Sequence, residues 1–249
     1  MRMEPIALSH HGRTVHGVFR APEGEGPFPA VLMSHGYNGC MTDFDATAEC
    51  LAEAGVASVA YTFCGGSTRD TSGFPTTQMT LFTEREDAVA LLDWLKESPL
   101  IDARRIFLFG GSMGGLVSVL AAAERPGDTA GLALLFPALC VPENWRERFP
   151  EAEDIPETVD FWGLTLGRVF FAAMREMDVF AILPGLSMPT VIFQGDQDPI
   201  VPLADSQRAA RLFPDAALHV FPGEGHGFSP AASGQVDGLL RDFVRKNCP

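Results

Sequence analysis

The sequence has little positive charge, and this shortage excludes several kinds of partner. Only 18 lysines and arginines stand against 32 acidic residues, so the formal net charge at pH 7 is −14. A nucleic-acid-binding protein needs a basic stripe to contact phosphates, and an anionic membrane surface attracts basic segments. We therefore expect neither nucleic acid nor a membrane as partner, and we take the acidity to favour solubility.

Paired cysteine motifs and long apolar runs are also missing. The five cysteines are odd in number and include no C-x-x-C pair, so we expect neither a disulfide framework nor a zinc site. No apolar run reaches the length of a membrane span, and the opening stretch MRMEPIALSHHGR lacks the apolar segment of a signal peptide. The sequence thus predicts free thiols, no bound metal and a cytoplasmic location.

The chain does contain a regular alternation of short apolar runs and helical segments. Apolar residues make up 46% of its 249 residues, enough for a large core. Buried strands are predicted at FPAVLMS, VASVAYTF, IFLFG, GLALLFP, TVIFQG and ALHVF, after a hairpin at 6–22. Helices are predicted at 42–55, 81–98, 113–126, 204–213 and 234–246. This order predicts an α/β fold, a single domain over 1–249 with a mostly parallel central sheet flanked by helices.

The stretch GGSMGG at 110–115 lies between a predicted strand and a predicted helix. Its glycines at 110 and 114 place Ser112 in the pattern G-x-S-x-G, which is typical of a sharp turn that exposes a serine hydroxyl. The stretch does not fit the register of a dinucleotide-binding loop or the ending of a phosphate-binding loop. Ser112 is therefore a candidate nucleophile at the N-terminus of a helix, where negative charge is favoured.

A serine nucleophile needs a base and a carboxylate that orients the base. Asp198 follows the strand TVIFQG, and His226 follows the last predicted strand between two glycines. This order of serine, acid and histidine is the one expected for such a sheet. Asp196 is the alternative carboxylate at the same turn, and we expect it to stabilise the loop. The histidines at 10, 11 and 16 are expected at the surface.

An oxyanion hole needs two backbone N–H donors. Met113, directly after the candidate nucleophile, is expected to supply one. The loop HGYNG follows another strand end and is expected to supply the other from Tyr37. Gly36 would allow close approach of the backbone, and His35 is expected to brace the loop rather than transfer protons.

Residues 139–183 interrupt the alternation and are rich in aromatic side chains. We expect this insertion to form a small lid over Ser112, with Trp145, Trp162 and Phe170 contacting substrate. Apolar spacing over 166–177 predicts a helix there. The acidic stretch 142–158 is expected to face water. Where it lines the entrance, it would disfavour anionic substrates, and Glu153 or Asp154 could anchor an amine.

Taken together, SHGYNG, FCGGSTRDTSG, GGSMGG, GDQDPIVP and GEGHGF resemble the α/β-hydrolase superfamily over nearly the whole chain. The short insertion and its segment FWGLTLGRVFF resemble the small bacterial cinnamoyl (feruloyl) esterases. In RVFF, however, phenylalanine stands where the lid tyrosine of those esterases is expected. The resemblance implies a serine hydrolase that cleaves small-molecule carboxylic esters, including hydroxycinnamoyl or short-chain ones, through an acyl-enzyme and without a cofactor.

Other readings of the same pattern remain open. A serine aminopeptidase or amidase would share the fold and the three side chains. A thioesterase would need a channel for a long carrier, which the sequence does not show. A non-catalytic binding protein of the same fold is the alternative from a different class, although such proteins usually lose one of the three side chains. By analogy, an exposed apolar lid face would suit a homodimer.

Overall fold

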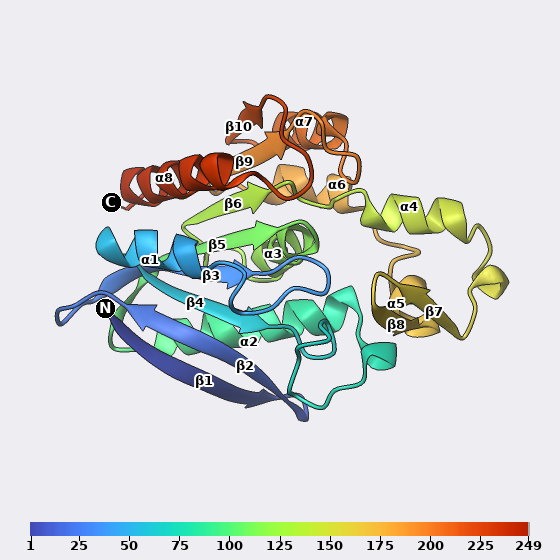
Figure 1. Ribbon diagram of the computed structural model, residues 1–249, viewed down its shortest axis with the longest axis horizontal. Coiled ribbons are helices and arrows are strands. Elements are labelled where there is room, and N and C mark those ends of the chain that lie inside the picture. The colour runs from blue at the N-terminus through green and yellow to red at the C-terminus, as the bar shows by residue number, and fades with distance from the viewer. Residues whose placement is uncertain (249) are drawn as a thin grey trace.

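Eight strands form one sheet through the molecule, and helices cover both of its faces (Figure 1). The computed structural model describes residues 1–248. The strands lie in the order β1-β2-β4-β3-β5-β6-β9-β10. Their bounds are β1 (Arg2–His10), β2 (Arg13–Ala21), β3 (Phe28–Ser34), β4 (Ala57–Thr62), β5 (Ile101–Gly111), β6 (Gly131–Leu135), β9 (Thr190–Gly195) and β10 (Ala216–Phe221). Within this sheet only the pairs β1/β2 and β2/β4 are antiparallel, which confirms a mostly parallel α/β sheet.

The antiparallel edge is the predicted N-terminal hairpin. Its turn is made by His11 and Gly12, whose φ angles of 44° and 76° are both positive. The expectation that His10 lies at the surface is wrong. Its side chain is only 10% exposed, and its Nε2 lies 2.9 Å from a carboxylate oxygen of Asp87, which is fully buried. The end of β1 thus packs onto the helix that contains Asp87.

Four helices connect strands close to the predicted positions, and a fifth follows the last strand. They are α1 (Asp45–Glu53), α2 (Leu81–Glu97), α3 (Met113–Glu124), α7 (Leu203–Leu212) and α8 (Pro230–Lys246). α1 begins later than predicted because the Asp43 carboxylate accepts a hydrogen bond from the Cys40 amide in the preceding turn, instead of capping the helix. α8 begins earlier, since the Ser229 hydroxyl accepts from the Ala232 amide and caps a first turn that contains proline.

Apolar side chains from both faces of the sheet make the core. All six residues of β4 and all six of β9 are buried, as expected for central strands covered on both sides. None of the helices within residues 1–248 combines the length and apolarity needed to cross a bilayer. Because β3, β5, β6 and β9 are parallel, the loops after them meet at one edge of the sheet, where ligands bind in this kind of fold.

The insertion between β6 and β9 lies beyond that edge (Figure 1). It contains α4 (Val141–Arg148), η2 (Ala152–Asp154), β7 (Thr158–Phe161), β8 (Leu164–Gly167), α5 (Arg168–Ala173), α6 (Val179–Ile182) and η3 (Leu183–Gly185). The helix expected over 166–177 is therefore wrong in extent. β8 pairs with β7 through Gly167, and a neighbouring short helix, η1 (Thr76–Gln78), fixes it through a hydrogen bond of 2.6 Å from Thr76 Oγ1 to the Thr165 carbonyl.

Candidate active site

The turn between β5 and α3 holds Ser112 in a conformation that L-residues rarely adopt. Its φ is 52° and its ψ is −118°. Such strain persists only where the surroundings impose it. Here the Ser112 amide donates to the Leu135 carbonyl (2.9 Å), and the Ser112 carbonyl accepts from the amide of Ala138 (2.9 Å). The loop after β6 thus clamps the backbone on both sides of the serine.

The two glycines of the motif are needed for close packing. A Cβ at Gly110 would overlap the backbone carbonyl of Gly114. A Cβ at Gly114 would overlap the carbonyl oxygens of Ser34 and His35, at the end of β3. The turn can therefore pass against the neighbouring strand end only because both side chains are absent, as expected from the sequence.

A chain of hydrogen bonds links Ser112 to two loops far away in the sequence. His226 Nε2 lies 3.0 Å from Ser112 Oγ, and His226 Nδ1 lies 2.8 Å from Asp198 Oδ2. The three side chains proposed from the sequence are thus brought together in the expected order. The Asp198 side chain is fully buried, whereas that of His226 is 17% exposed.

Further donors compensate the buried charge of Asp198. Its Oδ1 accepts from the amides of Ile200 (2.8 Å) and Val201 (2.9 Å), and its Oδ2 accepts from Gln194 Nε2 (3.1 Å). Asp196 is exposed instead, and its Oδ1 accepts from the Gly223 amide at 2.7 Å. Asp196 therefore stabilises the loop, and Asp198 alone faces the histidine.

The loop after β3 lies against the nucleophile. A Cβ at Gly36 would lie only 3.3 Å from Ser112 Cβ. His35 fixes this loop through two hydrogen bonds. Its Nε2 accepts from the Phe63 amide (3.0 Å), so its Nδ1 carries the proton and donates to the Gly36 carbonyl (2.6 Å). Burial lowers the pKa of His35 to about 4, so the ring is neutral and braces the loop as expected.

The two expected oxyanion donors both lie beside Ser112. Tyr37 and Met113 line the same pocket as the serine. Neither of their amides makes a hydrogen bond to the backbone within residues 1–248. Both N–H groups are therefore free to bind an oxygen atom that develops negative charge above Ser112.

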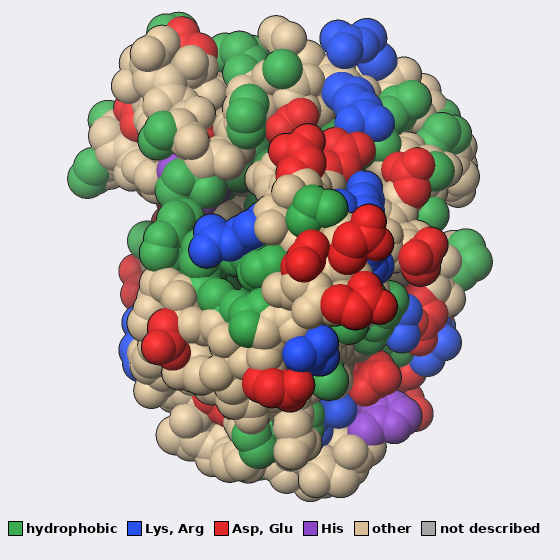
Figure 2. All heavy atoms as spheres, turned by 90° about the vertical axis from the view of Figure 1, so that its right-hand side faces the viewer, with side chains coloured by type: hydrophobic (Ala, Val, Ile, Leu, Met, Phe, Trp, Pro, Cys, Tyr) green, Lys and Arg blue, Asp and Glu red, His purple; other side chains and the backbone are tan. Residues whose placement is uncertain are grey.

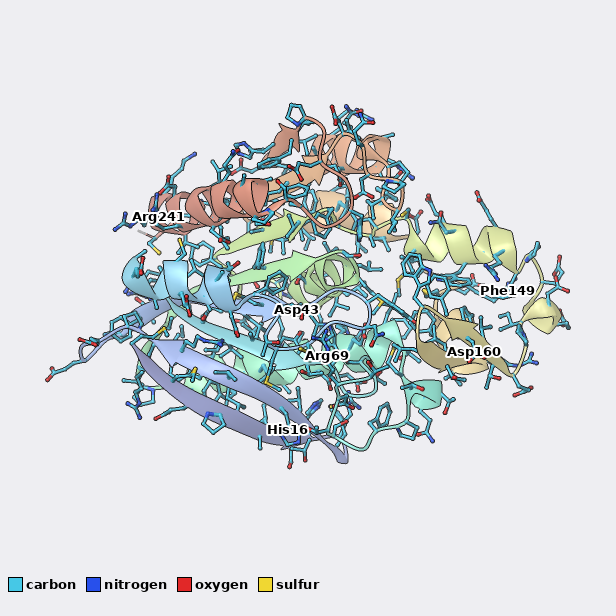
Figure 3. All side chains as sticks on the ribbon, viewed as in Figure 1. His16, Asp43, Arg69, Phe149, Asp160 and Arg241 are labelled. Carbon is cyan, nitrogen blue, oxygen red and sulfur yellow. The ribbon has the colours of Figure 1, made fainter. Side chains whose placement is uncertain are left out.

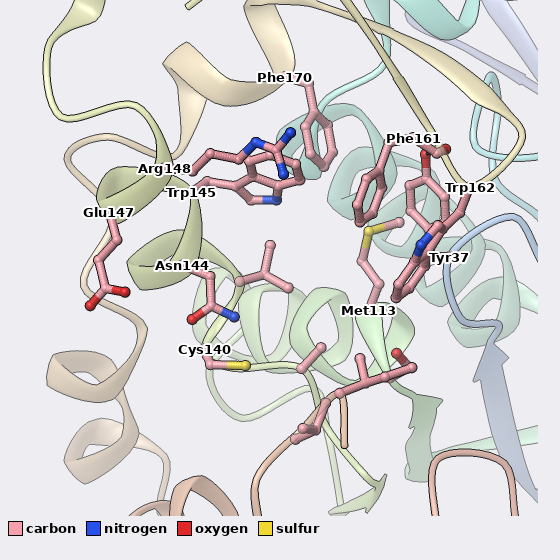
Figure 4. A pocket seen from close by; sticks show the side chains of 15 residues that line it. Tyr37, Met113, Cys140, Asn144, Trp145, Glu147, Arg148, Phe161, Trp162 and Phe170 are labelled. Atoms are coloured by element: carbon pink, nitrogen blue, oxygen red, sulfur yellow. Dashed lines mark hydrogen bonds between the residues drawn. The ribbon is translucent and has the colours of Figure 1, made fainter. Parts of the chain in front are cut away.

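A cavity of about 540 Å³ opens above the serine. Figure 2 shows a hollow on this face of the molecule, lined mostly by hydrophobic side chains. The lining comprises Tyr37, Ser112, Met113, Ala138, Cys140, Val141, Asn144, Trp145, Glu147, Arg148, Phe161, Trp162, Phe170, Ile200 and Val201. The three aromatic residues expected to contact substrate are all among them (Figure 4).

Two family models match the chain. The one described as "Serine aminopeptidase, S33" matches residues 25–171, which is more than half of the chain. The chain belongs to this family of α/β-hydrolases. A second model, described as "alpha/beta hydrolase fold", matches residues 140–229. Together the two matches contain the turn at Ser112 as well as Asp198 and His226.

Curated relatives and solved structures agree with the family. A putative carbamate hydrolase RutD from Variovorax paradoxus is 27% identical over 255 residues, covering 87% of this chain and 92% of the relative. Est1E from Butyrivibrio proteoclasticus, solved with ferulic acid bound, has a TM-score of 0.89 at 24% identity and covers 97% of this chain and 98% of its own. DcsB, solved with a substrate analogue, has a TM-score of 0.79 at 19% identity, with 99% of each chain covered. At these identities the two solved structures show the fold.

The hydrolase has one connection in this site that the sequence did not indicate. The Tyr37 hydroxyl donates to the Phe161 carbonyl (2.7 Å), and Asn38 Nδ2 donates to the Trp162 carbonyl (3.2 Å). The loop of the candidate oxyanion hole is thereby tied to the β7–β8 turn of the insertion. The partners lie 124 positions apart, and no local pattern signals a contact over that distance.

The same loop is held from the other side by charged residues. Arg69 donates to the Asn38 carbonyl (3.3 Å) and pairs with the Asp43 carboxylate (3.3 Å) (Figure 3). Asn38 Oδ1 accepts from the Thr68 amide at 2.8 Å. Asn38 itself has a φ of 55°, a conformation that asparagine tolerates better than most residues. The loop is therefore fixed by the polar segment that follows β4 as well as by the insertion.

The acidic stretch of the hydrolase contributes less to the pocket than its length suggests. Glu153 and Asp154 are exposed and lie outside the lining, so the structure does not support them as amine anchors. Glu147 is the only acidic residue of the lining, and Figure 4 shows its carboxylate pointing away from the other lining side chains. The expectation that the stretch faces water is confirmed for these residues.

The cysteines of this region do not offer a second nucleophile. Burial raises the pKa of Cys64 to about 12 and that of Cys140, which lines the pocket, to about 11. A thiol with such a pKa carries almost no thiolate at neutral pH. Within residues 1–248 there is also no group of three histidine, cysteine or acidic side chains arranged to hold a metal ion.

Proposed function

We propose that this protein is a serine hydrolase that cleaves carboxylic esters through an acyl-enzyme, without a cofactor. The observation that carries the proposal is the hydrogen-bonded chain from Ser112 through His226 to Asp198, at the floor of an open apolar pocket. A nucleophile, a base and an orienting carboxylate within hydrogen-bond distance form the arrangement that activates serine for acyl transfer.

In this reaction Ser112 Oγ attacks the ester carbonyl carbon while its proton passes to His226 Nε2. Asp198 holds the proton on Nδ1 and stabilises the imidazolium that forms. The carbonyl oxygen becomes an oxyanion and binds the amides of Tyr37 and Met113, at the N-terminus of α3. His226 then returns the proton to the leaving alcohol as the C–O bond breaks. A water molecule attacks the acyl-enzyme by the same steps and releases the acid.

The pocket favours an aromatic or short apolar substrate. Trp145, Phe161 and Phe170 present ring surfaces, and Phe170 is almost completely buried. We therefore place aromatic esters, hydroxycinnamoyl (feruloyl) esters among them, and short-chain alkyl esters in the substrate class. The aromatic walls supply apolar contact area, and a volume of about 540 Å³ can hold a ring together with its ester group.

An aminopeptidase activity is the second candidate, because the matching family model is described by that name. An aminopeptidase must hold a free amino group, which calls for a carboxylate in the pocket. The one carboxylate of the lining, Glu147, points away from the other lining side chains (Figure 4). This geometry favours an ester over a peptide with a free N-terminus. The third reading, a non-catalytic binding protein, does not account for the intact chain of hydrogen bonds.

Initial rates on a panel of substrates test the proposal. The panel contains 4-nitrophenyl esters of short acids, methyl ferulate, a phenyl carbamate and an aminoacyl-4-nitroanilide, each with the wild type and with Ser112→Ala. We expect turnover of the esters and its loss in the variant, which should still fold by circular dichroism. A preference for the anilide would move the protein to the peptidases. Wild-type activity in Ser112→Ala would refute the proposed nucleophile.

A further inference from the structure

One wall of the pocket is formed by a single face of α4. Arg148 lies three positions after Trp145 and four after Asn144, so the three side chains project from the same side of the helix. Figure 4 shows the Asn144 amide turned toward the pocket and the Arg148 guanidinium lying along the indole of Trp145, on the side of Phe170. All four residues belong to the pocket lining.

Arg148 differs from the other arginines of the insertion. Arg146 donates to the carbonyls of Met174 (3.3 Å) and Met177 (2.7 Å), and Arg175 donates to that of Phe149 (2.8 Å). These bonds hold the segments of the insertion together.

A further arginine, Arg168, pairs with the Glu157 carboxylate at 3.0 Å. In the part of the chain that the structure describes, Arg148 has no carboxylate within 4.0 Å and donates to no carbonyl. Each of the other three thus has a structural task that Arg148 lacks.

The guanidinium of Arg148 lies against aromatic rings instead. Its central carbon is 5.4 Å from the centre of the Trp145 ring and 5.8 Å from that of Phe149. This cation–π contact keeps the guanidinium of the exposed Arg148 near the rings and uses none of its N–H donors. A planar fork of donors beside an apolar cavity matches the two oxygens of a carboxylate.

We propose that Arg148 binds a carboxylate carried by the substrate, at the end remote from the reacting ester group. The preferred substrates would then be esters with an apolar spacer and a terminal acid, such as half-esters of dicarboxylic acids. This inference rests on the proposed ester hydrolysis at Ser112. It adds that the pocket selects for an anionic end, which the acidic composition of the chain did not predict.

The charges around Arg148 are compatible with this role. Its neighbour Glu147 points its carboxylate away from the pocket (Figure 4). Glu143, one turn earlier, is paired with Arg208 at 3.1 Å. The remaining acidic groups contribute to the net charge of −14, but salt screens exposed charges beyond roughly 8–10 Å. Contact with the guanidinium therefore outweighs the general repulsion of an anion.

Matched ester pairs test the inference. 4-Nitrophenyl pentanoate and mono-4-nitrophenyl glutarate differ only in a terminal methyl against a carboxylate. Their aromatic counterparts are 4-nitrophenyl 4-methylbenzoate and mono-4-nitrophenyl terephthalate. The readout is the ratio of kcat/KM for the anionic ester to that for the neutral one. We expect Arg148→Gln to lower this ratio about tenfold or more in at least one pair, as for the loss of a charge-assisted hydrogen bond.

Arg168→Gln is the matched control, because it removes the same charge from the same insertion outside the pocket. Equal falls in both variants would show a general charge effect and overturn the inference. An unchanged ratio in Arg148→Gln, with neutral esters still hydrolysed, would also overturn it and leave the proposed function standing. Arg148→Lys, which keeps the charge but not the planar fork, should give an intermediate ratio and replaces Arg148→Gln if that variant does not fold.

A binding measurement makes the test independent of turnover. Calorimetric titration of Ser112→Ala with mono-4-nitrophenyl glutarate or mono-4-nitrophenyl terephthalate measures affinity directly. It therefore tests the carboxylate site even if the wild type hydrolyses no ester, which would refute the proposed function. Adding Arg148→Gln to this background should weaken binding about tenfold for at least one of the two half-esters. Equal affinity with and without Arg148, for both ligands, would refute the carboxylate site.

Discussion

Glu84 is a buried acid without a partner, and it makes the stability of the fold depend on pH. It lies in the first turn of α2 and is 0% exposed. Neither of its carboxyl oxygens has a hydrogen-bond partner among the described residues. Gly66 provides the space, since a Cβ there would lie 2.6 Å from Glu84 Oε1. Burial, together with the nearby Asp87, raises the pKa of Glu84 well above its usual 4.5.

The sign of the effect follows from this direction. Above pH 4.5 the unfolded chain releases the Glu84 proton while the folded chain keeps it. The contribution to stability is therefore fully present below pH 4.5 and is lost as the pH rises toward the folded pKa. Between these two pKa values, the contribution of Glu84 to the free energy of unfolding should fall by about 1.4 kcal/mol per pH unit.

Urea unfolding of the wild type and Glu84→Gln between pH 4.5 and 7.5 measures this dependence. As the pH rises from 4.5 toward the folded pKa of Glu84, the difference between their unfolding free energies should change in favour of the variant, by about 1.4 kcal/mol per pH unit. The test lies in how this difference changes with pH. Its absolute size is not informative, because the buried amide of glutamine also needs hydrogen-bond partners. Glu97→Gln, exposed on the same helix, should give a line parallel to the wild type. Parallel lines for Glu84→Gln would refute the reasoning.

Three further predictions concern the site. Asp198→Asn should lower kcat about 10⁴-fold, because an amide favours the wrong tautomer of the histidine, whereas Asp196→Asn should stay near the wild type; similar rates for the two variants would contradict the assignment. Gly114→Ala should lower the free energy of unfolding by about 1–3 kcal/mol and abolish most of the proposed esterase activity; an unfolding free energy equal to that of the wild type in urea would contradict the overlap. Tyr37→Phe, which removes the bond to the Phe161 carbonyl, should lower kcat about tenfold with a smaller change in KM; steady-state kinetics with kcat unchanged would show that the bond does not position the oxyanion loop.

The sheet and the three side chains at Ser112 could be predicted because their signals are local. Each buried strand is a short apolar run, and each helix has its own periodicity. The turn at Ser112 is specified by two glycines within five residues. Asp198 and His226 follow strand ends, and a parallel sheet brings such ends to one edge. The sequence order of the elements was therefore enough to place residues far apart in the chain side by side.

The insertion could not be predicted to the same degree because its structure depends on distant contacts. Leu166 and Gly167 begin the stretch with helical spacing, yet they belong to β8, which pairs with β7 and is bonded to η1. Glu84 lies in the charged run TEREDA, which resembles a solvated helix face. Its burial depends on the loop at Gly66 folding over it. In both places a neighbour from elsewhere in the chain overrides the local preference.

Hydrogen bonds from Tyr37 and Asn38 fix the β7–β8 turn of the insertion to the candidate oxyanion loop. Movement of this turn would displace the backbone that we propose to hold the oxyanion. The contacts of α4 are different: Arg146 donates to the carbonyls of Met174 and Met177, and Glu143 pairs with Arg208. Different contacts of the same insertion therefore set the wall of the pocket along α4 and the position of the candidate oxyanion loop.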